Sequence, residues 1–514
     1  MTDDTLAAFQ KEFLVNLPSF QKIFLDELPA ALEKARVDGG IPGMSVAIMH
    51  NGKLVFAQGF GKRNREDPFT EETVSHIASV TKAFTATAIG ELVAEGKFQL
   101  KDPVLTSQLT LADLLSHRTP VPSVDLAWFR NPLSTRELIK QLRHLDLPSS
   151  KLSPFVNYNN AMYAVAGEAA ANVAGVTYAD LIKTKIFEPL GLKDAGLSMV
   201  EMAKRPNYAM PYDTVSLEYA KNGVIFEGYI DEIPMADAPA GDIFMNVVDL
   251  AKWGNVIMHE GELDGKQVLN KNSVKDTLTP HSIMTSARRK SNFAPTTGYG
   301  LGWVLDSYMG HACIEHGGAN PGYRSQLSFF PDRSLVVAVL ANINTTDLPF
   351  RLPYYIADGL LKVPENEDWI GDAAVQRTKD VYDLLTMITG NNTLDRIKDK
   401  PHSHDLADYV GEYTHPVHGK FTITLQEDGS GLQMRMRTFG CKLEHWHYDS
   451  FKGFAHDFAM KVILMLNFKT GNTGSVDAIE TVLSIGDEPE IFKKTMTPKS
   501  EKEEEEATTV AKEE

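Results

Sequence analysis

The stretch "HIASVTKAFT", residues 76–85, is the most informative in the chain, because it places Ser79 three residues before Lys82 at the start of a predicted helix. Apolar residues then recur at spacings that line one helix face, and Gly96 marks the end of the pattern. Residues three apart on a helix are neighbours, so the Lys82 side chain can reach the Ser79 hydroxyl. Serine is also a common helix N-cap. This stretch alone therefore allows two interpretations: an activated nucleophile, or a helix cap beside a surface lysine.

Two predicted β-hairpins enclose this region. The first, "MSVAIMHNGKLVFAQGFG" (residues 44–61), joins two β-type runs through Asn51-Gly52, a strong hairpin signal. The second, "RSQLSFFPDRSLVVAVLANIN" (residues 324–344), has two apolar runs around a turn at residues 331–334. Helical patterns precede and separate the hairpins: residues 20–37, "LTLADLLSH", "AMYAVAGEAAANVAG" and "VVDLAKWGNVIMHEG". The pattern predicts an α+β fold with an antiparallel sheet flanked by helices.

Composition narrows the class of protein. A chain of 514 residues exceeds what one core usually organises, so two or more domains are expected. Its 68 acidic residues outnumber the 51 basic ones, which argues against nucleic acid or an anionic membrane as the main partner. The two cysteines, Cys313 and Cys441, fall in different predicted domains, so no disulfide framework is expected. With no secretory signal or membrane-spanning apolar stretch found, we predict a cytoplasmic protein.

The character of the sequence changes after Lys362. A polar stretch and one connecting helix, "AAVQRTKDVYDLLTMITG", come first, and short β-type runs separated by turn residues follow from Leu406. The last residues carry a run of four glutamates without aromatics, which predicts a solvated, disordered tail. The predicted divisions are a first domain at 1–362, a helical linker at 363–402, a small antiparallel β-barrel at 403–497 and an acidic tail at 498–514.

Two further segments have a functional and a structural interpretation each. Tyr158 and Asn160 stand directly before an apolar helix, where an asparagine can act as a cap and a tyrosine can pack nearby. His316, Gly317 and Gly318 are predicted on or beside an edge of the sheet, where paired glycines let another backbone approach closely. Taken singly, each segment is explained by ordinary structure.

Taken together, the three segments point to one family. Ser79-x-x-Lys82, then Tyr158-x-Asn160, then His316-x-Gly318 resembles the serine β-lactamase and penicillin-binding-protein family, in its branch of class C β-lactamases, D-aminopeptidases and esterases. The resemblance covers about residues 20–360 and includes "IPGMSVAIMHNGKLVFAQGFG", "LADLLSHRTP", "IFEPLGL" and "YGLGW". It implies a β-lactamase-like fold, with an all-helical subdomain beside the antiparallel sheet.

The resemblance also implies roles for these residues. Ser79 would attack a carbonyl carbon, while Lys82 and the Tyr158 phenol take its proton and pass it to the leaving group. Which of the two is the formal base stays open, because their titrations are expected to be coupled. The backbone N–H groups of Ser79 and Ala319, the latter following Gly318, would bind the oxyanion. Asn160 would hold the substrate and Lys82 in place.

The sequence departs from the family pattern at two positions. His316 stands where β-lactamases and many penicillin-binding enzymes carry lysine, as in the esterase and aminopeptidase branch, so a binding charge for a substrate carboxylate is weakened. Pro120 stands where relatives usually have glycine, which predicts a different path for that loop.

The region from "LADYVGEYT" onward resembles the lipocalin-like barrel appended to some family members. Within it, His445 and His447 would share one face of a strand, which raises a metal hypothesis. We expect no metal site, because no third or fourth ligand is evident at a suitable spacing.

The sequence thus predicts a serine hydrolase that cleaves a small ester, lactone or amide through an acyl-enzyme, without a cofactor. A short peptide is a further possible substrate, and a homo-oligomer a possible assembly. The alternatives are a D-aminopeptidase or β-lactamase-type peptidase, an acyltransferase, and a binding protein of the same fold without turnover.

Overall fold

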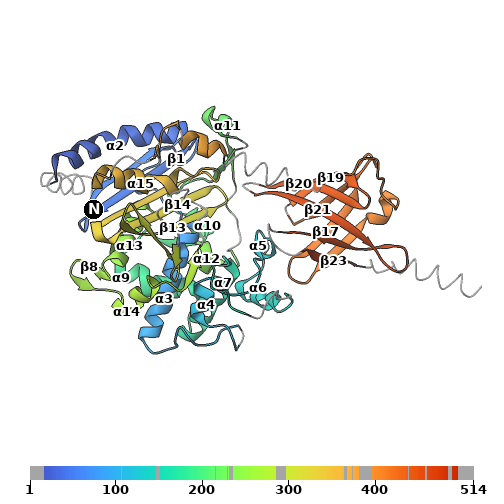
Figure 1. Ribbon diagram of the computed structural model, residues 1–514, viewed down its shortest axis with the longest axis horizontal. Coiled ribbons are helices and arrows are strands. Elements are labelled where there is room, and N and C mark those ends of the chain that lie inside the picture. Colours follow the sequence, from blue (N-terminus) through green and yellow to red (C-terminus); the bar gives the residue numbers. More distant parts are fainter. Residues whose placement is uncertain are drawn as a thin grey trace, which may run out of the picture. The chain divides into compact units, whose positions relative to one another are not determined.

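The computed structural model divides into two compact units, with the boundary between residues 385 and 386 (Figure 1). It describes residues 17–495 except 106, 146–150, 215, 229, 231–234, 285–296, 364–366, 373, 381–395, 438, 458–459 and 484–488. The predicted acidic tail and most of the predicted connecting helix lie outside the described residues, although residues 374–380 are helical. Within the described part, no helix is long and apolar enough to cross a membrane.

The first unit is built on an eight-stranded antiparallel sheet. Its strands, in spatial order, are β10 (Ser282–Met284), β11 (Thr297–Tyr299), β12 (Val304–Tyr308), β13 (His311–Asn320), β14 (Tyr323–Phe330), β15 (Leu335–Ala341), β1 (Gly43–His50) and β2 (Lys53–Gly61). Both predicted hairpins are confirmed. Asn51 and Gly52 both have positive φ, +52° and +73°, as a two-residue turn matched to the twist of the strands requires.

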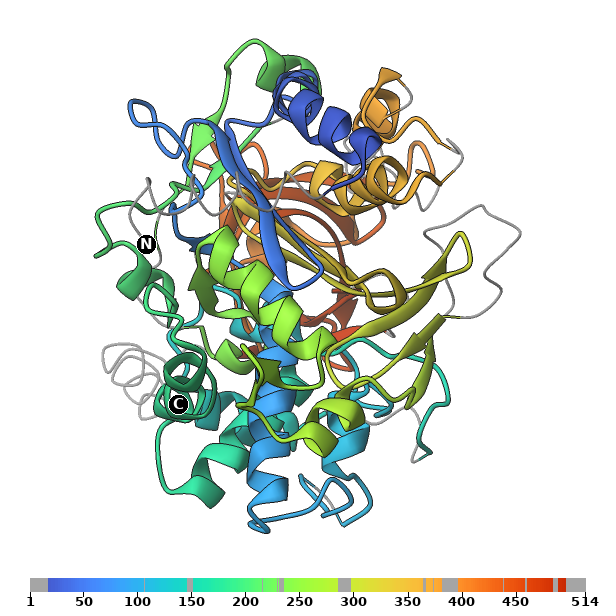
Figure 2. The same ribbon diagram turned by 90° about the vertical axis from the view of Figure 1, so that its left-hand side faces the viewer.

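Helices cover both faces of this sheet. On one face α2 (Ser19–Asp38) and α15 (Leu348–Leu361) lie side by side (Figure 2) and bury alternate residues of β15, among them Val337 and Val339. On the other face α13 (Val247–Met258) approaches closely, because Gly254 leaves room for Leu327 and Val336. A strand buried on both faces needs a continuous apolar run, which explains the sequence "LVVAVLA" of β15.

A helical region lies beside the sheet, as predicted. Its central helix, α3 (Thr81–Ala94), is buried on nearly all sides rather than on the one face that the sequence predicted, because α7, α8, α12 and α14 all pack against it. The predicted helix at 109–117 is only the five-residue α4 (Leu111–Leu115), closed at its start by a capping box between Thr110 and Asp113. The other helices of this unit are α5 (Asp125–Trp128), α6 (Thr135–Leu142), α7 (Asn160–Ala174), α8 (Tyr178–Ile182), α9 (Glu188–Leu190), α10 (Met199–Met202), α11 (Leu217–Lys221), α12 (Ala238–Gly241) and α14 (Lys271–Thr277).

The second unit contains a closed antiparallel barrel in which each strand pairs with the next and β16 pairs with β23. The strands are β16 (Gly411–His415), β17 (Gly419–Leu425), β18 (Leu432–Met436), β19 (Phe439–His447), β20 (Ser450–Asp457), β21 (Met460–Thr470), β22 (Val476–Thr481) and β23 (Glu490–Thr495). The sequence predicted the barrel but not β20 or β23, and it indicated β19 only through the strand considered for His445 and His447. Closure leaves no free strand edge, and interior positions alternate with exterior ones.

The predicted same-face placement of His445 and His447 is wrong. A β-bulge lies between them, so that His445 pairs with Phe451 and His447 with Ser450. Because Phe451 and Ser450 are adjacent and point to opposite faces, the two histidines also point to opposite faces.

Candidate active site

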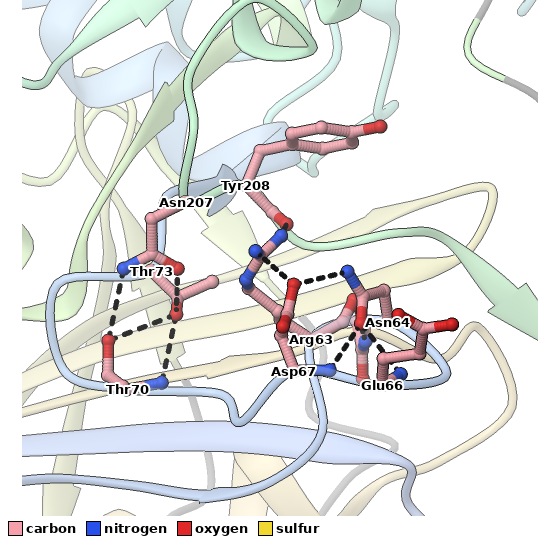
Figure 3. Close-up of polar contacts among 9 residues, drawn as sticks. Arg63, Asn64, Glu66, Asp67, Thr70, Thr73, Asn207 and Tyr208 are labelled. Carbon is pink, nitrogen blue, oxygen red and sulfur yellow. Dashed lines mark hydrogen bonds and ion pairs between the residues drawn. The ribbon is translucent and has the colours of Figure 1, made fainter.

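The segment that leads to Ser79 is anchored by a polar network (Figure 3). The Thr73 hydroxyl donates to the Asn207 side-chain oxygen (2.8 Å), and the Asn207 amide donates to the Thr70 hydroxyl (3.1 Å). Nearby, the Arg63 guanidinium donates to the carbonyl of Tyr208 (3.2 Å). These bonds join the loop after β2 to a segment more than 130 residues further along the chain. They hold the loop in place directly before Ser75 and His76, the short strand that leads to Ser79.

Ser79 lies at the centre of a single 3₁₀ turn, η1 (Ala78–Val80), between β3 (Ser75–His76) and α3. Ala78 has φ +47°, in the left-handed region that a non-glycine residue adopts at a cost. Ala78 and Val80 are fully buried, whereas Ser79 is partly exposed. The N-cap of α3 is Val80, not Ser79. The helix-cap interpretation of Ser79 is therefore wrong, and the turn instead presents its hydroxyl outside the core.

Lys82 is completely buried, so the surface-lysine interpretation is also wrong. Its Nζ donates to Ser79 Oγ at 3.1 Å and to the carbonyl of Ala240, on α12, at 2.8 Å. Burial lowers the pKa of Lys82 to about 7, although the carboxyls of Asp237 and Asp125 act in the opposite direction. Near neutral pH a large fraction of Lys82 is thus the free amine, which can accept a proton from the hydroxyl beside it.

Two carboxyl groups that the sequence analysis missed lie on the Lys82 side of the site. Asp237 is buried, which raises its pKa well above the ordinary value, and the charge of Asp125 acts in the same direction. Asp125 accepts from the side-chain amide of Asn160 at 3.1 Å. The predicted site residue Asn160 is therefore oriented by a carboxylate, while the described bonds of Lys82 go to Ser79 and Ala240.

Tyr158 is held beside Lys82 by His117, another residue that the sequence analysis missed. The Lys82 Nζ lies 4.8 Å from the centre of the Tyr158 ring. The His117 ring packs on the Tyr158 ring, with centroids 4.3 Å apart. The residues on either side of Tyr158 are bonded to His117. The N–H of Asn157 donates to the His117 carbonyl (2.7 Å), and the N–H of Asn159 donates to the Nδ1 atom of His117 (3.1 Å). His117 thus fixes the backbone before and after Tyr158 as well as its ring.

His117 is held in the neutral form. Because its Nδ1 accepts a hydrogen bond, the proton of the neutral ring is on Nε2. Burial lowers the pKa of His117 well below its ordinary value, and the positive charge of Lys82 acts in the same direction. The only signal in the sequence was the "LLSHRTP" stretch, which carried the family resemblance but assigned no role to the histidine.

The third predicted segment lies on β13, inside the sheet between β12 and β14 and not at an edge. A side chain at Gly318 would overlap the carbonyl of Ile77, as a Cβ there would lie 2.2 Å from that oxygen, so glycine allows β13 to pass directly beside η1. Ala319 follows at an exposed position. The predicted close approach of two backbones is therefore present, next to the turn that carries Ser79.

His316 is buried and engaged at both ring nitrogens. Its Nδ1 donates to the carbonyl of Gly317 at 2.7 Å, because a carbonyl oxygen can only accept. Its Nε2 lies 3.1 Å from the hydroxyl of Tyr299. In the neutral ring, Nε2 accepts from this hydroxyl. Neither the carbonyl of Gly317 nor the hydroxyl of Tyr299 carries a negative charge.

One group of three side chains among the described residues has the composition of a metal site, and it lies in the barrel: His415, His418 and Glu490. The Nδ1 of His415 accepts from the backbone N–H groups of Val417 (3.2 Å) and His418 (3.3 Å). The ring proton is then on Nε2, which faces Glu490 Oε2 at 3.2 Å. A metal on Nε2 would require the proton on Nδ1, where two N–H donors already point, so hydrogen bonding explains this group better.

Two known protein families match separate parts of the chain. A sequence model of the Beta-lactamase family matches residues 29–361, well over half of the chain, and a domain of unknown function (DUF3471) matches residues 395–495. The chain belongs to the Beta-lactamase family and is a serine hydrolase of that class.

Several relatives cover much of its length. The unguisins hydrolase ungD' of Aspergillus campestris is 26% identical over 430 residues, 76% of this chain and 75% of that protein. The putative penicillin-binding protein PbpX of Bacillus subtilis is 28% identical over 309 residues, 58% of this chain and 69% of that protein. Among solved structures, the octameric penicillin-binding protein homologue of Pyrococcus abyssi has a TM-score of 0.56 at 23% identity and covers 91% of this chain and 99% of that one. The last likeness shows the fold alone.

Proposed function

We propose that the protein cleaves a small ester, lactone or amide through an acyl-enzyme on Ser79. Ser79 Oγ adds to the acyl carbon while its proton passes to the free amine of Lys82. The bond to the leaving group breaks as that proton passes on to the leaving atom, directly or through the Tyr158 hydroxyl. Water then attacks the acyl-enzyme, with the same groups moving its proton. The backbone N–H groups of Ser79 and Ala319 would bind the oxyanion.

The observation that carries this proposal is the fully buried Lys82 amine, 3.1 Å from Ser79 Oγ. The test is a panel of ester, lactone, D-amino-acid amide and β-lactam substrates, assayed with the wild type and Ser79→Ala. Turnover of at least one substrate class that Ser79→Ala loses supports the proposal. Equal turnover by both proteins would refute it.

Two features bear on the choice of substrate. His316 is bonded to Tyr299 and Gly317, and a histidine in the place of lysine supplies no permanent positive charge for a substrate carboxylate. The carboxyl group of Asp125 instead contacts Asn160, a predicted substrate-binding residue. We therefore propose neutral esters first, and amides or peptides with a free amino group as the second candidate. Better hydrolysis of a penicillin than of every neutral ester at pH 8, where an ordinary histidine is neutral, would contradict both.

The predicted boundary at Lys362 is a further proposal, which the packing of later residues makes testable. Arg351, on α15, donates to the carbonyl of Trp369 (2.9 Å) and to the Thr378 hydroxyl (2.9 Å). A chain that ends after residue 380 keeps these bonds, and one that ends after residue 362 loses them. We expect both to retain Ser79 reactivity, with the shorter chain melting at a lower temperature. Equal melting temperatures would show that the later residues add nothing to the first unit.

Assembly and location are also proposals. The octamer is a property of the Pyrococcus abyssi protein, and for this chain we propose a homo-oligomer in the cytoplasm. Light scattering during size-exclusion chromatography tests the first part, and cell fractionation tests the second. A monomer at micromolar concentration, or recovery in a membrane or secreted fraction, would contradict the respective part.

A further inference from the structure

A directed chain of hydrogen bonds lies beneath the site. The side-chain amide of Asn320 donates to Nδ1 of His76 at 2.9 Å and to the carbonyl of Gly241 at 3.0 Å. Because Nδ1 of His76 accepts, its ring proton is on Nε2, which faces Asp242 Oδ1 at 3.2 Å. The His76 side chain is fully buried and that of Asp242 is 2% exposed. Each donor therefore has an acceptor, in the order Asn320, His76, Asp242.

The three residues come from three separate segments, each of which carries a different part of the site. His76 stands three residues before Ser79, and Asn320 directly follows Ala319 on β13. Asp242 stands two residues after Ala240, whose carbonyl accepts from Lys82. Backbone pairing supports the first and last of these segments: β3 pairs with β7 (Ile243–Met245), and Ile77 N–H donates to the Ile243 carbonyl at 2.9 Å.

No comparable backbone pairing joins the far end of β13 to η1 among the described residues. Here the Ser325 hydroxyl donates to the Ile77 carbonyl at 2.6 Å, and Gly318 contacts the same carbonyl. The bonds of Asn320 are the polar link on the Ala319 side of this contact. Loss of them would remove the polar link between this end of β13 and the segment before Ser79, while the pairing of Ala319 with Arg324 keeps β13 on β14, so that we expect a small displacement of Ala319 and an intact core.

We propose that Asn320, His76 and Asp242 are positioning residues that fix the separation between the backbone N–H groups of Ser79 and Ala319. The proposal rests on the proposed function, in which these two groups bind the oxyanion. An oxyanion hole acts only when both donors are about 2.7–3.1 Å from the place where the charge develops. A small displacement of one donor therefore slows the chemical step without a matching loss of substrate binding.

The test compares an ester with the thionoester of the same structure. The sulfur anion formed from a thionoester is a weaker hydrogen-bond acceptor, so its formation draws less on the two N–H donors. For Asn320→Ala we expect kcat on the ester to fall about tenfold with KM changed less than about twofold, and the ratio of ester to thionoester turnover to fall with it. Asp242→Asn keeps an oxygen acceptor for His76 and should retain most of the ester turnover.

The comparison includes a control variant and a replacement variant. Asn222→Ala removes an exposed amide that donates to the carbonyl of Glu218, and should leave both substrates unaffected. If Asn320→Ala fails to fold, Asn320→Leu replaces it, because a side chain of similar shape without polar atoms can neither donate to His76 nor accept from it. An equal loss on ester and thionoester, or no loss on either, would overturn the proposal.

The outcomes also separate this proposal from the proposed function. If Ser79→Ala retains turnover, the proposed function fails. If Ser79 is required but Asn320→Ala leaves the ester to thionoester ratio at the wild-type value, only the positioning role fails.

Discussion

Lys82 in the first unit and Glu490 in the barrel are both ionisable side chains partly or wholly withdrawn from water. For Lys82 burial is the largest effect, and it lowers the pKa to about 7, toward the neutral amine. For Glu490 the largest effect is the hydrogen bond from His418, which lowers its pKa and keeps it charged. The pKa is lowered in both cases, but lowering it favours the uncharged form of Lys82 and the charged form of Glu490.

The difference lies in the partners that the fold supplies. Lys82 has a hydroxyl and a carbonyl within hydrogen-bond distance, neither of which carries a charge. Glu490 has two histidines whose ring nitrogens point toward it. Burial beside neutral acceptors yields a base that can take a proton, whereas burial beside cationic or donor groups yields a stable pair. The same distinction separates a site built for chemistry from one built for stability.

Removing the amine should have the largest effect. Lys82→Met keeps the length and fills the buried volume but cannot accept a proton, so we expect kcat on a neutral ester to fall about 10³-fold. Because the variant also removes a buried ionisable group, its melting temperature should rise. Lys140→Met, at an exposed position of α6, is the matched control. Turnover within a few-fold of the wild type would exclude Lys82 as the base.

The pH profile should show the lowered pKa of Lys82 directly. In the proposed mechanism the free amine of Lys82 is the active form, so kcat/KM should be constant at high pH and fall as the pH drops through about 7. Between pH 8 and pH 5.5 we expect a decrease of about thirtyfold for a substrate that does not itself titrate. A profile that stays flat down to pH 5 would show that no group with this pKa is needed in its basic form.

His117 should have a smaller effect, because it acts on Tyr158 and not on substrate. His117→Ala removes the ring that packs on Tyr158 and the acceptor for the N–H of Asn159. We expect kcat to fall about tenfold to a hundredfold with little change in KM. His117→Asn, which can offer an acceptor oxygen, should recover part of the loss. If both variants lose stability but keep wild-type kcat, His117 serves only the fold.

The barrel pair should matter least for turnover. Glu490→Gln should lower the stability of the barrel by about 1–2 kcal/mol at pH 7 and leave kcat unchanged. Since the folded pKa of Glu490 is lowered, the contribution is present above its ordinary pKa and lost as the pH falls through the folded value. Hydrogen exchange of barrel amides in the full chain measures this. If the difference in barrel stability between wild type and Glu490→Gln grows as the pH is lowered, the pairing of Glu490 with the histidines is contradicted.

The sequence could predict the parts of the molecule that depend on local spacing. Ser79 and Lys82 are one helical turn apart, and Asn51-Gly52 specifies its hairpin without help from the rest of the fold. Strands such as β23 were missed because a barrel strand needs an apolar side chain only on its inner face, and Phe492 is the one fully buried residue in β23. The other residues of β23 include three charged ones, and such a composition is typical of a loop.

The rest of the site depends on contacts that no local pattern contains. His117 acts on Tyr158 across about forty residues, through bonds such as that from the N–H of Asn159. The pKa of Asp237 is raised mainly by burial, and also by the charge of Asp125, and both depend on segments that the folded chain brings together. Burial of a polar residue is a property of the folded chain, so neither residue could be assigned from its type or spacing.

The most direct test of a covalent mechanism on Ser79 is to find which side chain becomes modified by an alkyl fluorophosphonate. We expect one adduct per chain in the intact mass, located on Ser79 by peptide mapping, and we expect Lys82→Met to slow the labelling strongly. The result that would contradict it is an adduct on another residue, or labelling of Ser79→Ala at the wild-type rate.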